Sequence, residues 1–248
     1  MITIKTPEEI KLMRESGRIL ATALHAIIKT ARPGVTTLEL DRAAEALIVS
    51  MGGKPGFKGY DGFPFSLCAS VNENIVHGLP SNYKLKEGDI VGLDLGAIYK
   101  GYYSDMAITI PIGKVSFETK RLLDVTRKSL RLGIKKAKIG NTVGDVGNTI
   151  QRFIEDQGYG LVRDLCGHGI GKDLHEDPKI PNFGERGKGE ALREGMVICI
   201  EPMITMGDYR LKKSADGYGY ATKDNSLSAH FEHTIAITKN GPKILTEK

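Results

Sequence analysis

The chain has 248 residues, of which 40% are hydrophobic and 26% are charged, and its formal net charge is +5 at pH 7. This length and composition fit one compact domain with a single core and exclude a low-complexity, collagen-like or disordered protein. No apolar run approaches the roughly 20 residues of a membrane-spanning helix, and the first residues lack the apolar core of a signal peptide. We therefore expect a cytoplasmic protein with no membrane partner and a single domain over residues 1–248.

The cysteine content argues against a disulfide-stabilised or zinc-knuckle protein. Cys68, Cys166 and Cys199 are an odd number of thiols and form no CxxC pair. Such spacing favours neither a disulfide framework nor a structural zinc site. We expect reduced thiols that mostly pack in the interior.

The first half of the chain begins with two predicted helices. Thr6-Pro7-Glu8-Glu9 combines an N-cap threonine, a proline at the first helical position and a glutamate at the third;. Apolar residues continue at helical spacing, and the helix ends before Pro33-Gly34. Thr36 or Thr37 caps a second helix, which Gly52-Gly53 stops.

A β-hairpin follows these helices. Residues 90–99 and 102–110 have the pattern of two strands joined by a two-residue turn;. That turn places Asp94 and Asp105 diagonally on the same face, within roughly 7–8 Å between backbones. Two carboxylates at that separation can share one metal ion, and two ions roughly 3.5–4 Å apart are equally compatible.

The second half of the chain repeats this order. Helices are expected from about Glu118 to Lys136 and again from Thr142, and strands at residues 197–200 and 234–238 come after them;. Because helices precede strands in both halves, the predicted class is α+β with a mainly antiparallel sheet.

Four acidic residues occupy matching places in the two halves. An apolar run ends at Asp94, and another ends at Glu201, 107 residues later; Asp105 and Glu232 each open the next strand-like segment. An uncompensated buried charge would be very costly at such positions. A divalent metal ion is the first candidate for the positive charge that must balance these acids.

Further matches recur in the same order at offsets near one hundred residues, among them His77 with His175. They argue for two copies of one unit, roughly residues 1–112 and 113–248, that face each other in a pseudo-two-fold domain. His168 lies in a glycine-rich loop and has no mate in the first half;. Its nitrogen would join a mostly oxygen ligand set, which suits Mn²⁺, Fe²⁺, Co²⁺ or Zn²⁺.

Five short motifs carry a resemblance to a known family. They are Leu-Asp-Leu-Gly, Tyr-Tyr-Ser-Asp-Met-Ala, Gly-His-Gly-Ile-Gly, Ile-Glu-Pro-Met and Phe-Glu-His-Thr. With the opening Lys5-Thr6-Pro7, this ordered set closely resembles the type I methionine aminopeptidases. The resemblance implies the pita-bread fold, in which two pseudo-symmetric halves share an antiparallel sheet covered by helices. It also implies removal of the initiator methionine from nascent proteins whose second residue is small.

The same resemblance assigns the metal ligands. It implies a site for two divalent ions, with Mn²⁺, Fe²⁺, Co²⁺ and Zn²⁺ all left open. In that family the acids that match Asp105 and Glu232 bridge the two ions. Asp94 then holds one ion, and His168 with Glu201 holds the other.

The resemblance also names catalytic and substrate-binding residues. His77 contacts the substrate near the scissile amide, His175 is placed to donate a hydrogen bond to the carbonyl, and Glu201 is the proton shuttle. A satisfied imidazole in a turn is the competing interpretation for either histidine, as core packing is for each aromatic residue. The substrate pocket is expected to be lined by Tyr60, Phe63, Cys68, His77, Leu174 and Tyr218.

Two pocket positions depart from the family pattern. Leu174 stands where a phenylalanine is common, and Tyr218 stands where a tryptophan is expected, since the chain has no tryptophan. These departures bear on methionine selectivity and leave the expected metal chemistry untouched.

Other relatives with the same ligand set fit less well. Proline-specific aminopeptidases and creatinase-like enzymes carry a sizeable N-terminal domain. Type II methionine aminopeptidases carry a helical insertion, for which the 33 positions from His168 to Glu201 leave no room. A non-catalytic relative that binds ribosomes or RNA through a basic surface should have lost ligands, whereas all five are present. The expected partners are nascent N-termini and, transiently, the ribosome, and the expected state is a monomer.

Overall fold

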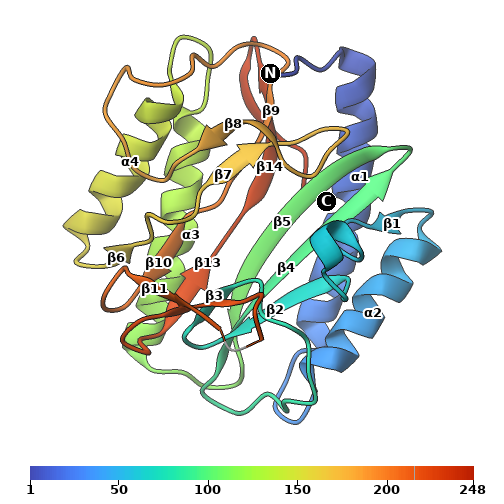
Figure 1. Ribbon diagram of the computed structural model, residues 1–248, viewed down its shortest axis with the longest axis vertical. Helices are drawn as coiled ribbons and strands as arrows, with labels where there is room; N and C mark the ends of the chain where they lie inside the picture. Colours follow the sequence, from blue (N-terminus) through green and yellow to red (C-terminus); the bar gives the residue numbers. More distant parts are fainter. Residues whose placement is uncertain (215) are drawn as a thin grey trace.

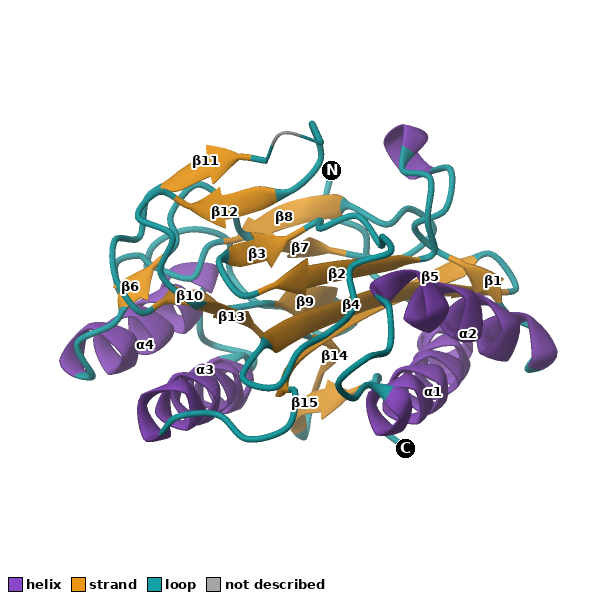
Figure 2. Cartoon of the chain, turned by 90° about the horizontal axis from the view of Figure 1, so that it is seen from below, coloured by secondary structure: helices purple, strands orange, loops and turns teal. Residues whose placement is uncertain are grey.

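The computed structural model describes residues 1–214 and 216–248. Its helices come in two pairs, one at the start of each half of the chain: α1 (Pro7–Thr30), α2 (Thr37–Ser50), α3 (Phe117–Lys136) and α4 (Val143–Asp156). All four lie on one side of the strands, with α1 and α2 behind one half and α3 and α4 behind the other (Figure 1, Figure 2). None of the described helices has the length and apolar character needed to cross a membrane.

The helix starts follow from local hydrogen bonding. The side chains of Thr6, Thr36 and Thr142 each accept a hydrogen bond from the backbone N–H three residues later. The residue at that position is acidic, and its carboxylate accepts a hydrogen bond from the backbone N–H of the threonine. Each reciprocal pair satisfies two backbone N–H groups that the helix leaves free. Thr36 is therefore the cap of α2, and Thr37 is its first helical residue. Ser116 caps α3.

Every strand pair formed by the described residues is antiparallel. One sheet contains β1 (Lys54–Pro55), β2 (Leu67–Val71), β4 (Ile90–Tyr99) and β5 (Tyr102–Pro111). Another has the order β15 (Gly241–Ile244), β14 (His233–Thr238), β9 (Val197–Ile200), β7 (Gly167–Gly169) and β8 (Glu176–Ile180). A third sheet has the order β13 (Ser228–His230), β10 (Met203–Thr205) and β6 (Gly160–Leu161). A fourth has the order β11 (Leu211–Lys213), β12 (Tyr220–Thr222) and β3 (Asn74–Val76). A 3₁₀ turn, η1 (Tyr60–Gly62), precedes β2.

The β4–β5 hairpin has the predicted register. Its turn residues, Lys100 and Gly101, both have positive φ, as the mirror-image turns that suit twisted strands require;. Asp94 lies opposite Ala107, and Asp105 therefore lies diagonal to Asp94 on the same face;.

A seam between β5 and the β13–β14 segment joins the two halves. At its centre the backbone N–H of Glu232 donates to a β5 carbonyl over 2.9 Å. On one side the Thr109 hydroxyl accepts from the N–H of His230 at 2.9 Å and donates to its carbonyl at 2.8 Å. On the other side the Thr234 hydroxyl makes the same pair of bonds to Asp105. The seam thus satisfies backbone groups through side chains and sets two of the four acids beside each other.

Each helix pair buries its apolar face on its own half of the strands. Leu24 of α1 belongs to the same buried cluster as Leu93 of β4. In the other half, Leu122 of α3 and Ile150 of α4 share a buried cluster with Ile200 of β9. Because the helices all cover one side, the opposite face of the strands is left for the acids.

Candidate active site

Four buried carboxylates converge from four separate chain segments. Asp94 and Asp105 lie within β4 and β5, Glu201 directly follows β9, and Glu232 directly precedes β14. The ligand oxygens of Asp94, Asp105 and Glu232 lie within 4.8 Å of one another. These three residues are at most 8% exposed, and the Glu201 side chain is 12% exposed. The structure therefore brings together the four acids that occupy matching places in the two halves of the sequence.

The His168 imidazole faces this cluster. Its Nε2 lies 3.6 Å from Oε1 of Glu201 and 3.9 Å from Oδ2 of Asp105. Its Nδ1 lies 2.9 Å from the carbonyl of Gly169, which can only accept a hydrogen bond. The ring proton is therefore on Nδ1, and the Nε2 lone pair is directed toward the acids.

His230 belongs to the same cluster and was missed by the sequence analysis. Its Nε2 lies 3.5 Å from Oε2 of Glu201 and 3.9 Å from Oε2 of Glu232. It is 2% exposed, and Nε2 has no hydrogen-bond partner among the described residues. The available signal was its position two residues before Glu232, since alternate residues of an extended segment share a face.

Burial controls the protonation of these groups. It raises the pKa of Asp94 to about 6 and holds the pKa values of Asp105, Glu201 and Glu232 well above their usual range, and neighbouring carboxylates add to the effect on these three;. Burial, with a contribution from His175, lowers the pKa of His168 to about 3. The imidazole is therefore neutral at pH 7, and a bound cation would stabilise the charged form of the four carboxylates.

The donor set fits a divalent metal ion. Oδ1 of Asp94, Oδ1 of Asp105 and Oε1 of Glu232 are buried and have no hydrogen-bond partner within the described part of the chain. A buried oxygen without a partner costs free energy that a bound cation recovers. Carboxylates with a neutral imidazole form the mixed oxygen and nitrogen set typical of first-row divalent ions. Cys199 is also nearby; its Sγ lies 3.4 Å from the Thr234 hydroxyl, and burial raises the pKa of the thiol well above the usual value.

A cavity of about 310 Å³ opens above the acids. His77 and His175 both line it, and burial lowers the pKa of each ring, to about 4 for His77. His77 has a φ of 57°, in the left-handed region that residues other than glycine adopt rarely and at a cost in free energy;. The His175 ring is 4.4 Å from that of His168, and its Nδ1 is 2.9 Å from the Tyr60 hydroxyl.

Aromatic side chains form one wall of the cavity. Phe63 and Tyr218 meet edge to face with ring centroids 5.7 Å apart;. The Tyr218 hydroxyl donates to the carbonyl of Gly62 over 3.1 Å, which ties the β11–β12 connection to η1. All six residues predicted for the pocket line this one cavity: Tyr60, Phe63, Cys68, His77, Leu174 and Tyr218.

Another part of the wall is formed by Tyr220 and Lys213, which were not predicted from the sequence. Tyr220 lies beside His77, with ring centroids 6.0 Å apart, and the ammonium of Lys213 lies 4.2 Å from the centre of the Tyr220 ring. These residues reach the cavity because β12 pairs with β3, directly before His77. That pairing joins segments more than 140 residues apart and has no local signature.

Comparisons with known proteins agree with this geometry. The model of metallopeptidase family M24 matches residues 11–239. A methionine aminopeptidase of Clostridium perfringens is 49% identical over 246 residues, which cover 99% of each chain. The solved methionine aminopeptidase of Thermotoga maritima superposes with a TM-score of 0.98 at 46% identity and covers 100% of both chains.

The fold is shared with other peptidases. A solved prolidase of Pyrococcus furiosus has a TM-score of 0.80 at 28% identity, and the match covers 99% of this chain and 65% of that one. The predicted pita-bread fold is confirmed, and so is the resemblance to methionine aminopeptidases. This protein is a member of metallopeptidase family M24, a family that depends on divalent metal.

Proposed function

We propose that this chain removes the initiator methionine from nascent polypeptides whose second residue is small. The observation that carries the proposal is the cavity itself, which has an aromatic wall and, at its base, carboxylate oxygens without hydrogen-bond partners among the described residues. In a chain so similar to methionine aminopeptidases, that arrangement suits an apolar, unbranched side chain next to a free amine. Residues 1–248 would act as one catalytic unit, with halves of roughly 1–112 and 113–248 each giving two of the acids.

Two divalent ions, of Mn²⁺, Fe²⁺, Co²⁺ or Zn²⁺, are proposed for the acid cluster. Asp105 and Glu232 would bridge both ions, Asp94 would hold one, and His168 with Glu201 would hold the other. When bound, the ions would supply Lewis acidity toward the scissile carbonyl and lower the pKa of water. His230 would adjust the orientation of Glu201 and Glu232, whose outer oxygens it faces;.

His175 is the proposed donor to the carbonyl oxygen of the substrate. Its lowered pKa keeps the ring neutral at pH 7, and burial raises the pKa of Tyr60, which keeps the phenol proton in place. Tyr60 then donates to Nδ1, and the ring's own proton lies on Nε2. A neutral donor fixed in this way stabilises the oxyanion as it forms, without prior reorganisation.

Glu201 is the proposed proton shuttle. Its pKa lies well above the usual range because of burial and the charge of Asp94, so it can take a proton near neutral pH and give it to the leaving amine;. His77, neutral because of its low pKa, would contact the substrate near the scissile amide. Proton transfer would then take place where the acid cluster meets the aromatic wall of the cavity.

Release of free methionine from Met-Ala-Ser tests the proposal. Chelator-stripped protein is assayed with Mn²⁺, Fe²⁺, Co²⁺ or Zn²⁺ added back, and Leu-Ala-Ser and Ala-Pro-Ser serve as control substrates. We expect metal-dependent cleavage of Met-Ala-Ser alone. Absence of cleavage by metal-loaded protein would reject the proposal, and cleavage of Ala-Pro-Ser alone would indicate a proline-specific peptidase.

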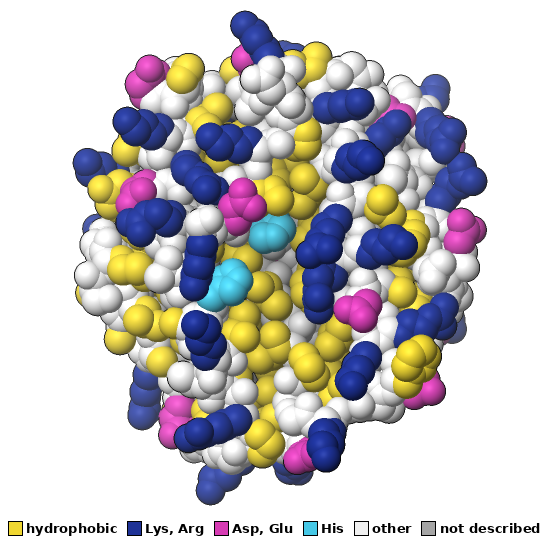
Figure 3. Space-filling model, turned by 180° about the vertical axis from the view of Figure 1, so that it is seen from behind, with side chains coloured by type: hydrophobic (Ala, Val, Ile, Leu, Met, Phe, Trp, Pro, Cys, Tyr) yellow, Lys and Arg dark blue, Asp and Glu magenta, His cyan; other side chains and the backbone are white. Residues whose placement is uncertain are grey.

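The helix-covered side supports a proposed transient association with ribosomes. Seen from behind, this side carries many Lys and Arg side chains around a narrow apolar strip (Figure 3). Helix α3 alone has seven basic residues against Glu118 and Asp124. A basic surface of this kind attracts the phosphate backbone of RNA, so co-sedimentation with ribosomes should weaken as salt rises. Co-sedimentation that does not respond to salt would contradict an electrostatic association.

A further inference from the structure

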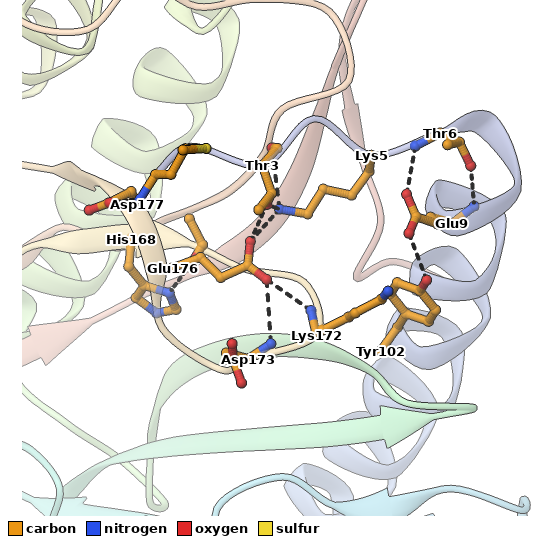
Figure 4. Close-up of polar contacts among 12 residues, drawn as sticks. Thr3, Lys5, Thr6, Glu9, Tyr102, His168, Lys172, Asp173, Glu176 and Asp177 are labelled. Carbon is orange, nitrogen blue, oxygen red and sulfur yellow. Dashed lines mark hydrogen bonds and ion pairs between the residues drawn. The ribbon is translucent and has the colours of Figure 1, made fainter.

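The loop that carries His175 is held by hydrogen bonds to the side chain of Glu176, the residue after His175. This loop runs from the end of β7 to Glu176, the first residue of β8. Oε1 of Glu176 accepts hydrogen bonds from the N–H groups of Lys172 at 2.9 Å and Asp173 at 3.4 Å. The Glu176 carboxylate thus binds two backbone amides of the loop, as Figure 4 shows.

The other oxygen of Glu176 is held from a distant part of the chain. Nζ of Lys5 lies 2.5 Å from Oε2, and the hydroxyl of Thr3 contacts both partners. The two charged side chains are only 5% and 10% exposed. The N–H of Lys5 donates to the carbonyl of Gly195 over 2.8 Å, so the lysine backbone is fixed to the body of the protein. A buried, hydrogen-bonded ion pair therefore connects the N-terminal segment to the His175 loop.

A glycine of the His168 motif makes room for this ion pair. A Cβ atom on Gly171 would lie 2.5 Å from Oε1 of Glu176 and 2.5 Å from Cε of Lys5. Gly195, where the Lys5 backbone is anchored, has a φ of +83°, and a Cβ there would lie 2.9 Å from the Lys5 carbonyl oxygen. Glycine at positions 171 and 195 thus allows Lys5 to pack closely against the backbone at both places.

Independent contacts fix the outer side of the same loop. The N–H of Tyr103 donates to the carbonyl of Gly171 over 2.8 Å. The ammonium of Lys172 lies 5.9 Å from the centre of the Tyr102 ring, and the Tyr102 hydroxyl donates to Glu9 over 2.8 Å. Glu9 is the capping-box acid of α1. The loop is therefore held between β5 and the start of α1, and the Lys5–Glu176 pair is the only salt bridge to residues 170–176 within the described part of the chain.

We propose that Lys5 and Glu176 are positioning residues for His175. The inference rests on the proposed function, in which His175 donates to the substrate carbonyl. The pair acts through the loop, because Glu176 adjoins His175 in the chain and holds the preceding backbone amides. A donor that moves by about 1 Å can lose roughly a hundredfold in rate, so the orientation of this imidazole has a direct effect on turnover.

Kinetics of Lys5→Met and Glu176→Gln test this role. We expect kcat for Met-Ala-Ser to fall by roughly tenfold to a hundredfold, with KM changed less than about threefold, because the donor acts in the transition state. Arg18→Met is the matched control, since Arg18 pairs with Glu15 on the surface of α1 at 2.5 Å, far from the loop in sequence. Lys5→Arg, which keeps the charge, should recover part of the lost kcat.

A double-variant cycle shows whether the effect passes through His175. In the His175→Ala background, Lys5→Met should lower kcat by less than about twofold, because the residue to be positioned is gone. Additive losses would overturn the proposal, and so would a kcat of Lys5→Met within twofold of the parent. The variant Lys5→Met/Glu176→Gln leaves no buried unpaired charge, so it provides the same test if a single variant fails to fold.

Hydrogen exchange of metal-free protein gives a readout that needs no activity. Lys5→Met should speed amide exchange in residues 170–176 and leave the β4–β5 hairpin unchanged. Faster exchange throughout the protein, or unchanged exchange in the loop, would show that the pair has no local effect on the His175 segment. If the parent protein releases no methionine, the proposed function fails, and this exchange measurement still decides whether the pair orders the loop.

Discussion

Glu176 and the acids of the cluster are two kinds of buried carboxylate, and their surroundings differ. Glu176 receives an ammonium, a hydroxyl and two backbone amides; burial alone would raise its pKa, but the hydrogen bonds from Lys5 and Thr3 outweigh burial and lower it. In the cluster, Asp105 and Glu232 keep oxygens without partners among the described residues, and their pKa values are well above the usual range. An acid whose partners belong to the chain serves the fold, whereas an acid without them is poised for a cation from solution.

Removing an acid that is proposed to bridge the metal ions should produce the largest contrast. We expect Asp105→Ala to abolish both metal retention and methionine release, because Asp105 is central to the proposed ligand set. Metal content is measured by emission spectroscopy after gel filtration, and methionine release by the peptide assay. Glu176→Gln should retain its metal. Unchanged metal content in the Asp105 variant would remove its bridging role.

Removal of the proposed donor should separate chemistry from metal binding. We expect His175→Ala to retain metal and to lose turnover by roughly 10²-fold to 10⁴-fold, the usual contribution of a positioned proton donor. Thermal unfolding should remain close to that of the parent, since the ring is partly exposed to the cavity. A loss of metal from this variant would instead assign His175 to the ligand set.

The pH dependence of stability should have opposite signs for the two groups. Asp94, with a folded pKa of about 6 against 3.8, binds its proton more tightly when folded. Metal-free protein should therefore lose stability as pH rises from about 4 to beyond 6, by roughly 1.4 kcal/mol for each pKa unit. Urea unfolding at several pH values measures this slope. Asp94→Asn should reduce it, and an unchanged slope would mean that other groups are responsible.

Glu176 should show the reverse behaviour. Its lowered pKa gives stability that is present above the unfolded pKa and is lost as pH falls through the folded one;. Glu176→Gln should therefore lose stability at neutral pH and show a flatter acid limb in the same unfolding series. A steeper acid limb would contradict the assignment of a charged, partnered carboxylate.

The smallest expected effect concerns the aromatic wall. Tyr218→Phe removes the hydrogen bond to Gly62 and keeps the ring. One such bond is worth about 1 kcal/mol, so KM for Met-Ala-Ser should rise roughly fivefold with kcat nearly unchanged. A large fall in kcat would indicate that the hydroxyl takes part in the chemistry.

Local signals explain which parts of the fold could be predicted. The β4–β5 hairpin closes through two residues, so alternation and turn length together placed Asp94 and Asp105 on one face;. The capping boxes at Thr6 and Thr142 likewise fixed the starts of their helices. Each of these features depends on residues that are close in sequence.

The remaining parts depend on pairings between distant segments. Glu201 and Glu232 lie next to the pair Ile200–His233, where β9 meets β14, and only the repeat and the family resemblance indicated that they belong to one site. His230 reaches the acids through the seam with Thr109, which no period of the sequence signals. The contact of Lys5 with Glu176 spans 171 residues and depends on the finished fold.

The seam between the halves would give the proposed metal ions a mechanical role as well. Asp94 and Asp105 belong to one half and Glu201 and Glu232 to the other, while threonine hydroxyls provide much of the seam beside them. Ions that are bound by acids of both halves would form a reversible cross-link between them. Metal binding would then stiffen the contact between the two halves. The metal-bound protein would resist forces that separate the halves more strongly than the metal-free protein does.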